Sequence, residues 1–287
     1  MSDINQIIND KLEMLLKSGI DSSRFEIKLL IGHILGVEPK DLSLTSELST
    51  AQLRELDKML DKRLRHCPVD KIIGSKGFYK YDFVVNEDVL SPRADTEVLV
   101  EKAIVILHQQ KEPKILEFGV GSGCIILSVL ADIKDAKGIG VDISEQALAV
   151  TDINAEKLDI SDNRLVLMNM SWFDDNAEQV LSEYAPFDMI LSNPPYIASD
   201  EIVGLDEEVK NYDPWVALDG GQDGLKDYVR ILDLAQKLLK QGGCLLLEAG
   251  DGEQLERIAN AGKLRSLEVV EKAKDLGGIE RCIILKK

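Results

Sequence analysis

The segment Asn193-Pro194-Pro195-Tyr196 holds the residue types that could take part in chemistry most directly. Two consecutive prolines keep the residues before them extended and remove two backbone donors. The side-chain oxygen of Asn193 and the carbonyl oxygen of Pro194 then remain as acceptors, and Tyr196 adds a flat wall. Two acceptors that bind both N–H groups of a planar nitrogen can orient it and stabilise developing positive charge. The segment indicates methyl transfer to an amide or ring amine, and a plain strand-ending turn is the simpler alternative.

A glycine-rich loop provides a second candidate site. Residues 115–118 have the apolar pattern of a buried strand, and Gly119, Gly121 and Gly123 follow it before an apolar helix. Glycines at such a position let the backbone turn tightly and approach a ligand that lies across the strand ends. Cys124 stands where a dinucleotide fingerprint has its third glycine, which weakens a nicotinamide or flavin assignment. No Gly-Lys-Ser/Thr follows, so the loop is not a nucleoside-triphosphate P-loop.

Asp142 ends the next expected strand and gives the loop a chemical partner. An acid at this position can accept hydrogen bonds from ribose hydroxyls. A glycine loop and an acid, without a pyrophosphate signature, favour a nucleoside cofactor. S-adenosylmethionine fits, because its amino-acid end is zwitterionic and its ribose offers two hydroxyls. A helix cap before Ser144 is the alternative role for Asp142.

The elements that must position these residues alternate along the second part of the chain. From Ser91 onward, short apolar strands alternate with helical patterns, which predicts an α/β fold with a mostly parallel sheet covered on both faces. The carboxyl ends of such strands meet at one edge of the sheet, where ligands bind. The expected strands are 114–118, 138–143, 165–169, 187–192 and 243–248, with a last pair near 266–270 and 281–285.

The first part of the chain has a different pattern, and three regions are expected. Residues 1–70 read as a small all-α domain, in which Ser49 and Gln52 form a capping box. Residues 71–90 alternate between apolar and polar types and indicate a β-hairpin linker. Residues 91–287 form the sheet domain. Within it, the acidic cluster 206–208 reads as a solvated face.

Composition narrows the class of protein. The 287 residues contain 34 Lys and Arg against 51 Asp and Glu, a formal net charge of −17. Such a surface disfavours general affinity for nucleic acids and for anionic membranes. The chain shows no signal segment, no membrane span and no metal-ligand spacing among its four cysteines. A cytoplasmic, metal-free monomer without stable nucleic-acid or membrane binding is expected.

With these motifs placed, the chain resembles the HemK-type glutamine methyltransferases, which act on peptide chain release factors. The resemblance implies the class I methyltransferase fold, a Rossmann-like and mostly parallel seven-stranded sheet. It runs nearly from end to end and includes the helical region, the segments 68–74, 91–97, 119–123, 192–197 and 213–225, and Arg281.

The resemblance also implies roles for individual residues. The loop 119–123 would hold the methionine part of S-adenosylmethionine, Asp142 its ribose and Trp172 its adenine. The cofactor-binding set that follows is Glu117, Gly119, Val120, Gly121, Ser122, Gly123, Asp142, Ser171, Trp172 and Asn193. Asn193, Pro194, Pro195 and Tyr196 would bind the substrate glutamine of a Gly-Gly-Gln loop, with Asn193, Pro194 and Tyr196 as catalytic residues. The helical domain would grip the body of the release factor, which places the protein in translation termination.

The family pattern is not met at every position. Glu117 stands at the usual aspartate position, Ser171 where an acidic residue often meets the adenine amino group, and Ala94 where a proline is usual. Gly220-Gly221-Gln222 matches the substrate motif by coincidence.

Three alternatives remain open from the residues. Exocyclic amines of DNA or RNA need the same two acceptors, although a base-flipping enzyme would want basic clusters. A glutamine of a ribosomal protein would suit the same segment. A catalytically silent cofactor-binding module is the third alternative, and failure to bind S-adenosylmethionine would be its mark.

Overall fold

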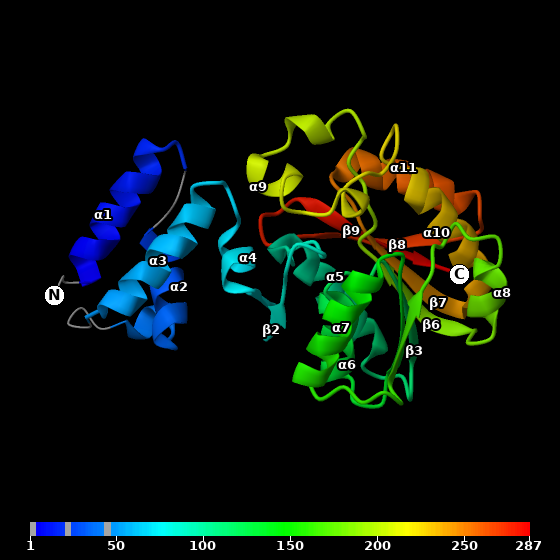
Figure 1. Ribbon diagram of the computed structural model, residues 1–287. Coiled ribbons are helices and arrows are strands. Elements are labelled where there is room, and N and C mark those ends of the chain that lie inside the picture. The colour runs from blue at the N-terminus through cyan, green and yellow to red at the C-terminus, as the bar shows by residue number, and fades with distance from the viewer. Residues whose placement is uncertain (1–3, 21–23, 43–46) are drawn as a thin grey trace. The chain divides into compact units, whose positions relative to one another are not determined.

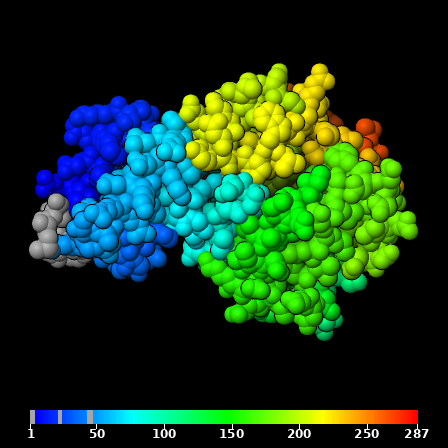
Figure 2. Space-filling model, viewed as in Figure 1, coloured from blue at the N-terminus to red at the C-terminus, as the bar shows by residue number. Residues whose placement is uncertain are grey.

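A computed structural model describes residues 4–20, 24–42 and 47–287 (Figure 1). The chain forms two compact units. One contains Met1–Ser75 and Asp206–Tyr212, and the other contains Lys76–Leu205 and Asp213–Lys287. Figure 2 shows most of the first unit's surface in blue and cyan and most of the second unit's surface in green to red. Each unit has its own apolar core.

The first unit is helical in its described part. Its elements are α1 (Ile4–Lys17), α2 (Arg24–Leu35), η1 (Pro39–Asp41), α3 (Thr50–Arg63), α4 (Val69–Ile73) and α9 (Glu207–Lys210). The capping box at the start of α3 is confirmed, because Ser49 Oγ accepts from the backbone N–H of Gln52 at 3.3 Å and Gln52 Oε1 accepts from the backbone N–H of Ser49 at 2.9 Å. Apolar side chains such as Ile8, Ile27 and Leu56 are buried between the helices.

The segment around α9 belongs to the helical unit although its sequence lies within the second half of the chain. The expectation of a simple solvated acidic face is wrong for Glu208, whose Oε1 lies 2.6 Å from Nη2 of Arg63. Tyr212 closes the segment by donating its hydroxyl to the carbonyl of Arg65 at 2.6 Å. The periodicity of a short acidic stretch carries no information about such a distant basic partner.

The second unit contains the expected seven-stranded sheet, in the order β5-β4-β3-β6-β7-β9-β8. Its strands are β3 (Lys114–Phe118), β4 (Lys137–Asp142), β5 (Leu165–Asn169), β6 (Phe187–Ser192), β7 (Leu239–Glu248), β8 (Glu268–Lys274) and β9 (Glu280–Lys286). The first five are parallel, and β9 runs antiparallel to both neighbours. A separate hairpin pairs β1 (Ser75–Phe78) with β2 (Tyr81–Val84). The class I fold prediction is confirmed.

The strand order creates the place where the candidate residues meet. From β3 the chain moves outward through β4 and β5 and then returns to β6, on the other side of β3. This reversal opens a crevice at the carboxyl ends of β3 and β6, the usual ligand site of open α/β sheets. The glycine loop follows β3 and Asn193 follows β6, so both expected motifs reach the same crevice.

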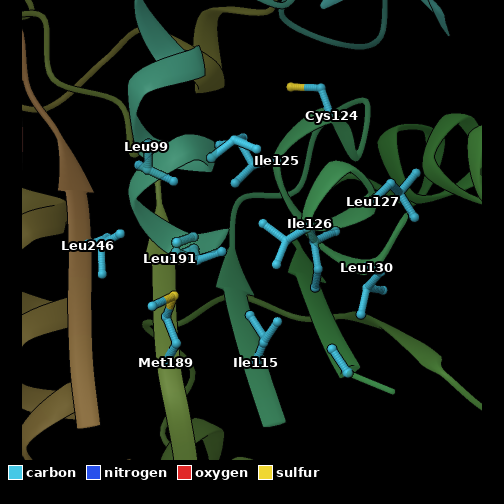
Figure 3. Packing of buried hydrophobic residues seen from close by; sticks show 14 of the residues in the cluster. Leu99, Ile115, Cys124, Ile125, Ile126, Leu127, Leu130, Met189, Leu191 and Leu246 are labelled. Carbon is cyan, nitrogen blue, oxygen red and sulfur yellow. The ribbon is translucent and has the colours of Figure 1, made fainter. Parts of the chain in front are cut away.

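Helices cover both faces of the sheet. The helical elements of this unit are η2 (Ala94–Thr96), α5 (Glu97–Leu107), α6 (Cys124–Asp132), α7 (Glu145–Lys157), α8 (Ala177–Ser182), η3 (Ile202–Gly204), η4 (Trp215–Ala217), α10 (Lys226–Leu238) and α11 (Gly252–Lys263). Figure 3 shows Ile115 of β3 and Leu191 of β6 on the face that packs against Leu99 of α5 and Ile125 of α6. Leu116 faces the opposite core, with side chains of α10 and α11. Burial on both faces explains why the strands read as continuous apolar runs.

Two strand boundaries differ from expectation. Strand β7 begins at Leu239, before a register shift opposite β6 and before Gly242, which has φ +79°. Because this first stretch is irregular and partly exposed, its residues do not show the apolar pattern by which a buried strand is predicted. Strand β8 lies at the sheet edge and is mostly exposed, so its sequence shows little alternation. Among the described residues, no helix combines the length and apolar character needed to cross a membrane.

Candidate functional site

A cavity of about 660 Å³ lies at the carboxyl ends of the central strands. Cavities of a few hundred Å³ are the usual size for small-molecule sites. Residues from several separate segments line it, among them Glu117, Gly119, Gly121, Asp142, Ser171, Trp172 and Asn193. The structure therefore brings most of the sequence-predicted site residues into one cavity, together with Val120, Ser122 and Pro195.

The glycine loop adopts backbone conformations that other residues rarely take. Gly119, Gly121 and Gly123 have φ angles of +75°, +54° and +79°. A Cβ on Gly123 would come within 2.7 Å of Leu127 and within 2.8 Å of Thr151, so this position also needs the missing side chain for space. A Cβ on Gly121 would meet nothing within 4 Å, so glycine is favoured there only because the φ angle is positive. The loop thus brings bare backbone to the cavity.

Glu117 is a buried carboxyl at the end of β3, with one oxygen satisfied and one open. Its Oε2 accepts from the backbone N–H of Ile126 at 2.8 Å, in the first turn of α6. Its Oε1 has no hydrogen-bond partner among the described residues. Burial raises the pKa of Glu117 well above its usual value, the hydrogen bond from Ile126 opposes this, and the charge of Asp142 adds to it. An open carboxyl oxygen at a cavity wall suits a cationic or N–H donor.

Asp142 ties two loops together beneath the cavity. Its Oδ2 accepts from the backbone N–H of Gly121 and its Oδ1 accepts from that of Ser144, both at 2.9 Å. Burial raises the pKa of Asp142, and these backbone donors oppose the rise. The cap of α7 is Ser144, whose Oγ accepts from the backbone N–H of Ala147 at 3.1 Å. Asp142 is therefore held in one orientation, with its carboxylate at the wall of the cavity.

Trp172 forms another wall of the cavity. Its ring is 8% exposed and meets Phe118 edge to face, with ring centroids 6.0 Å apart. The indole N–H donates to Oδ1 of Asp227 at 2.9 Å, which fixes the plane of the ring. Neighbouring Ser171 also lines the cavity, and its Oγ accepts from the backbone N–H of Phe173 at 3.1 Å.

The Asn-Pro-Pro-Tyr segment begins directly after β6. Asn193 and Pro195 line the cavity, whereas Pro194 and Tyr196 lie outside the set of described lining residues. Asn193 Nδ2 donates to Oγ1 of Thr96 at 3.4 Å. The Tyr196 ring lies against Gly250, where an added Cβ would come within 3.2 Å of it. Burial raises the pKa of Tyr196 to about 12, and the charge of Glu248 adds to the effect.

A loop of the segment 213–225 packs directly onto the Asn-Pro-Pro-Tyr backbone. Ile197, which follows Tyr196, donates its backbone N–H to the carbonyl of Leu218 at 3.1 Å and accepts from the backbone N–H of Gly220 at 2.9 Å. A Cβ on Gly220 would lie 2.8 Å from the carbonyl oxygen of Pro195, and one on Gly224 would lie 2.4 Å from that of Tyr196. Close backbone approach therefore accounts for Gly220 and Gly224.

Comparison with known proteins gives the chain a family. A family model described as a methyltransferase domain matches residues 109–280, and one described as the PrmC N-terminal domain matches residues 6–74. A release factor glutamine methyltransferase of Rhodospirillum rubrum is 37% identical over 272 residues, which are 94% of this chain and 81% of that relative. The chain belongs to the release factor glutamine methyltransferase family.

Other relatives of this methyltransferase vary in length and similarity. A bifunctional methyltransferase of Rickettsia felis is 33% identical over 98% of this chain, and the chain spans 57% of that relative. A solved structure from Streptococcus mutans, described as a SAM-dependent methyltransferase, has a TM-score of 0.52 at 11% identity, and the match covers 72% of this chain and 53% of that one. The latter likeness concerns the fold alone.

The structure adds residues of this methyltransferase that the sequence motifs did not indicate. Asp227 accepts from the Trp172 indole, and Thr96 accepts from Asn193. Glu248 ends β7 beside them and is 2% exposed. The position of Glu248 at the site could be predicted from the sequence, because it ends an expected strand as Asp142 does. Thr96 and Asp227 approach the site only through tertiary packing. Within the described ranges, no group of three or more His, Cys, Asp or Glu side chains is arranged to hold a metal ion.

Proposed function

We propose that this chain methylates the side-chain amide nitrogen (N5) of the glutamine in the Gly-Gly-Gln motif of peptide chain release factors. S-adenosylmethionine is the methyl donor. The observation that carries the proposal is the position of Asn193, directly after β6 and in the wall of the same cavity as the glycine loop. The family of the chain supports the substrate, since its relative from Rhodospirillum rubrum is a release factor glutamine methyltransferase.

The residues of the cavity fit S-adenosylmethionine. The open Oε1 of Glu117 suits the α-amino group at the amino-acid end of the cofactor. The bare backbone of 119–123 leaves room for the methionine part, and the carboxylate of Asp142 at the cavity wall suits the ribose hydroxyls. Trp172 offers an aromatic surface for adenine, with Ser171 beside it.

The substrate side is assigned to the Asn-Pro-Pro-Tyr segment. When bound, S-adenosylmethionine supplies an electrophilic methyl group on its sulfonium sulfur. Asn193 Oδ1 and the carbonyl oxygen of Pro194 accept from the two N–H groups of the glutamine amide, which orients the nitrogen and stabilises the positive charge that develops on it. The methyl–sulfur bond breaks as the methyl–nitrogen bond forms, and the nitrogen then loses a proton to water. Tyr196, packed behind the segment, and Pro195 keep these acceptors in place.

The two units have separate tasks in this proposal. The helical unit, residues 1–70 together with the α9 segment, binds the body of the release factor. The region 71–90 links it to the methyltransferase domain, residues 91–287. The net charge of −17 supports a protein substrate over nucleic acid. We expect a monomer that acts in the cytoplasm, on the machinery of translation termination.

The test combines purified protein, isotopically labelled S-adenosylmethionine and a bacterial release factor, followed by peptide mass spectrometry. We expect one added methyl group on the Gly-Gly-Gln glutamine, and none with Asn193→Ala. Label on a ribosomal protein or a nucleic acid instead would keep the methyl-transfer chemistry and overturn the substrate. Absence of transfer to any of these, with S-adenosylhomocysteine still bound, would indicate a silent binding module.

A further inference from the structure

Glu248 lies directly behind the proposed substrate site. It is the last residue of β7, and the parallel pairing of Ser192 with Leu247 brings the ends of β6 and β7 together. Asn193 follows β6 at this point, so the two side chains meet. Hydrogen bonding from the Thr96 and Asn193 side chains lowers the pKa of the Glu248 carboxyl, so both side chains lie beside it. Its Oε2 is buried and has no hydrogen-bond partner among the described residues.

The chemistry of these three groups fixes the direction of each hydrogen bond. An ionised carboxylate can only accept, so Thr96 must donate its hydroxyl proton to Glu248, and Asn193 must present its NH2 group. The same NH2 group donates to Oγ1 of Thr96 at 3.4 Å. Both N–H groups of the Asn193 amide are then directed toward Thr96 and Glu248, and Oδ1 remains for the cavity that Asn193 lines.

Shape alone could not choose this orientation. The oxygen and nitrogen ends of an asparagine amide are nearly identical in size, so only the surrounding donors and acceptors distinguish them. A reversed Asn193 would present N–H groups to the N–H groups of a substrate amide, which cannot bind it. The orientation of one amide therefore decides whether the proposed site has its acceptor.

We propose that Glu248 is a positioning residue that acts through Thr96 and Asn193: its carboxylate holds the Asn193 amide with Oδ1 toward the substrate nitrogen. The inference rests on the proposed role of Asn193 and adds the residue that makes this role possible. It gives Thr96, within the segment 91–97, a task in the same site.

Protonation of Glu248 would remove the constraint. A neutral carboxyl can donate to Thr96, and Thr96 can then donate to Oδ1 of Asn193, which reverses the chain of hydrogen bonds. Burial raises the pKa of Glu248 to about 7 and the charge of Asp95 adds to the rise, while the hydrogen bonds and the charge of Arg281 oppose it. Electrostatic interactions link this carboxyl to a set of titratable and charged groups, which consists of Asp95, Cys124, Tyr196, Tyr228, Arg281 and Cys282.

The first experiment compares pH profiles of methyl transfer for the wild type, Glu248→Gln, Thr96→Val and Glu253→Gln. Glu253 is exposed in the first turn of α11 and provides the same chemical change away from the site. For the wild type and the Glu253 variant, kcat should rise with pH through a midpoint of about 7. Glu248→Gln and Thr96→Val should each lower kcat at least about tenfold. Glu248→Gln should lose the rising limb, whereas Thr96→Val, which keeps the contact between Asn193 and Glu248, should weaken it. Affinity for S-adenosylhomocysteine should stay within about twofold, which separates positioning from loss of fold.

A second measurement does not depend on activity. The side-chain amide of Asn193, followed by ¹⁵N NMR, should titrate with the same midpoint in the wild type, respond more weakly in Thr96→Val, and not titrate in Glu248→Gln. A wild-type rising limb that persists in both variants, or an Asn193 amide that does not respond to pH, would overturn the inference. If the wild type transfers no methyl group to glutamine, the proposed function fails, while the NMR titration still decides the role of Glu248.

Discussion

The helical unit and the carboxyl edge of the sheet both bury charged side chains, and they satisfy them differently. In the helical unit, Arg63 is almost fully buried, and its Nη2 lies 2.6 Å from Oε1 of Glu208 and 3.6 Å from Oε1 of Glu26. Its Nε and Nη1 have no partner among the described residues. At the sheet edge, Glu117 has one satisfied oxygen, and the like charge of Asp142 raises its pKa further.

The difference separates a structural use of buried charge from a ligand-binding use. Arg63 is neutralised by carboxylates of its own unit, one of which belongs to the α9 segment, so the pair holds that segment in place. Among the described residues no cation pairs with Glu117, and a buried carboxyl in that state is costly unless a ligand supplies the cation. Groups of this kind gather at functional sites, because a ligand can satisfy them.

The largest expected effect tests the ligand-binding edge through Asn193. Asn193→Ala removes one of the two proposed acceptors for the glutamine amide and should lower kcat about 10²- to 10³-fold. Affinity for S-adenosylhomocysteine should change by less than about twofold, since the glycine loop and Asp142 are untouched. Steady-state methyl transfer and calorimetric binding measure the two quantities. Equal losses in both would show that Asn193 supports the cavity as a whole.

Asp142 should produce the next largest effect, on cofactor binding. Asp142→Ala removes the acceptor for the backbone N–H groups of Gly121 and Ser144 as well as the proposed ribose contact. We expect affinity for S-adenosylhomocysteine to fall about tenfold to a hundredfold by calorimetry, because each lost hydrogen bond to a charged group costs about 1.5–3 kcal/mol. Asp142→Asn keeps the size of the side chain and one oxygen, so its affinity for S-adenosylhomocysteine should lie between those of the wild type and Asp142→Ala. Unchanged binding in Asp142→Ala would remove the residue from the cofactor site.

The helical unit should respond to loss of charge in its stability instead. Arg63→Met keeps much of the buried volume but releases Glu26 and Glu208, whose side chains are 28% and 39% exposed and can hydrate. We expect the free energy of unfolding to fall by about 1–3 kcal/mol in denaturant titrations, with cofactor affinity unchanged. Lys11→Met, which breaks the pair with Asp57 at 2.6 Å, serves as the control and should cost less than about 1 kcal/mol. A loss of cofactor affinity in Arg63→Met would erase the distinction between the two regions.

The same contrast explains which features the sequence could predict. The glycine loop, Asp142 and Asn193 are found because a strand pattern ends just before each of them, and strand ends share one edge of a parallel sheet. The capping box of Ser49 is equally local. The Arg63–Glu208 pair joins residues far apart in the chain, and no spacing rule connects them. Thr96 is hidden for the same reason, since it reaches Asn193 from a distant segment, whereas Glu248 ends an expected strand.

The smallest expected effect is the release of a proton from Glu117 when the cofactor binds. It tests the contrast between Arg63, which carboxylates neutralise, and Glu117, whose Oε1 is open. Because burial raises the pKa of Glu117, this carboxyl holds a proton above the pH at which an unfolded glutamate has lost it. The cofactor-free protein should therefore lose stability as pH rises through the window between the usual and the raised pKa. A cationic α-amino group beside Oε1 favours the ionised form of Glu117. Binding of S-adenosylhomocysteine should therefore make Glu117 release up to about one proton.

Calorimetry in buffers of different ionisation enthalpy measures this release, and we expect it at pH values above the usual pKa of a glutamate. Glu117→Gln cannot ionise and should release fewer protons, whereas Glu253→Gln should match the wild type. The cofactor-free Glu117→Gln protein should also lose less stability than the wild type as pH rises. Proton uptake on binding, or the same release in Glu117→Gln, would mean that the open oxygen of Glu117 does not receive the cationic end of the ligand.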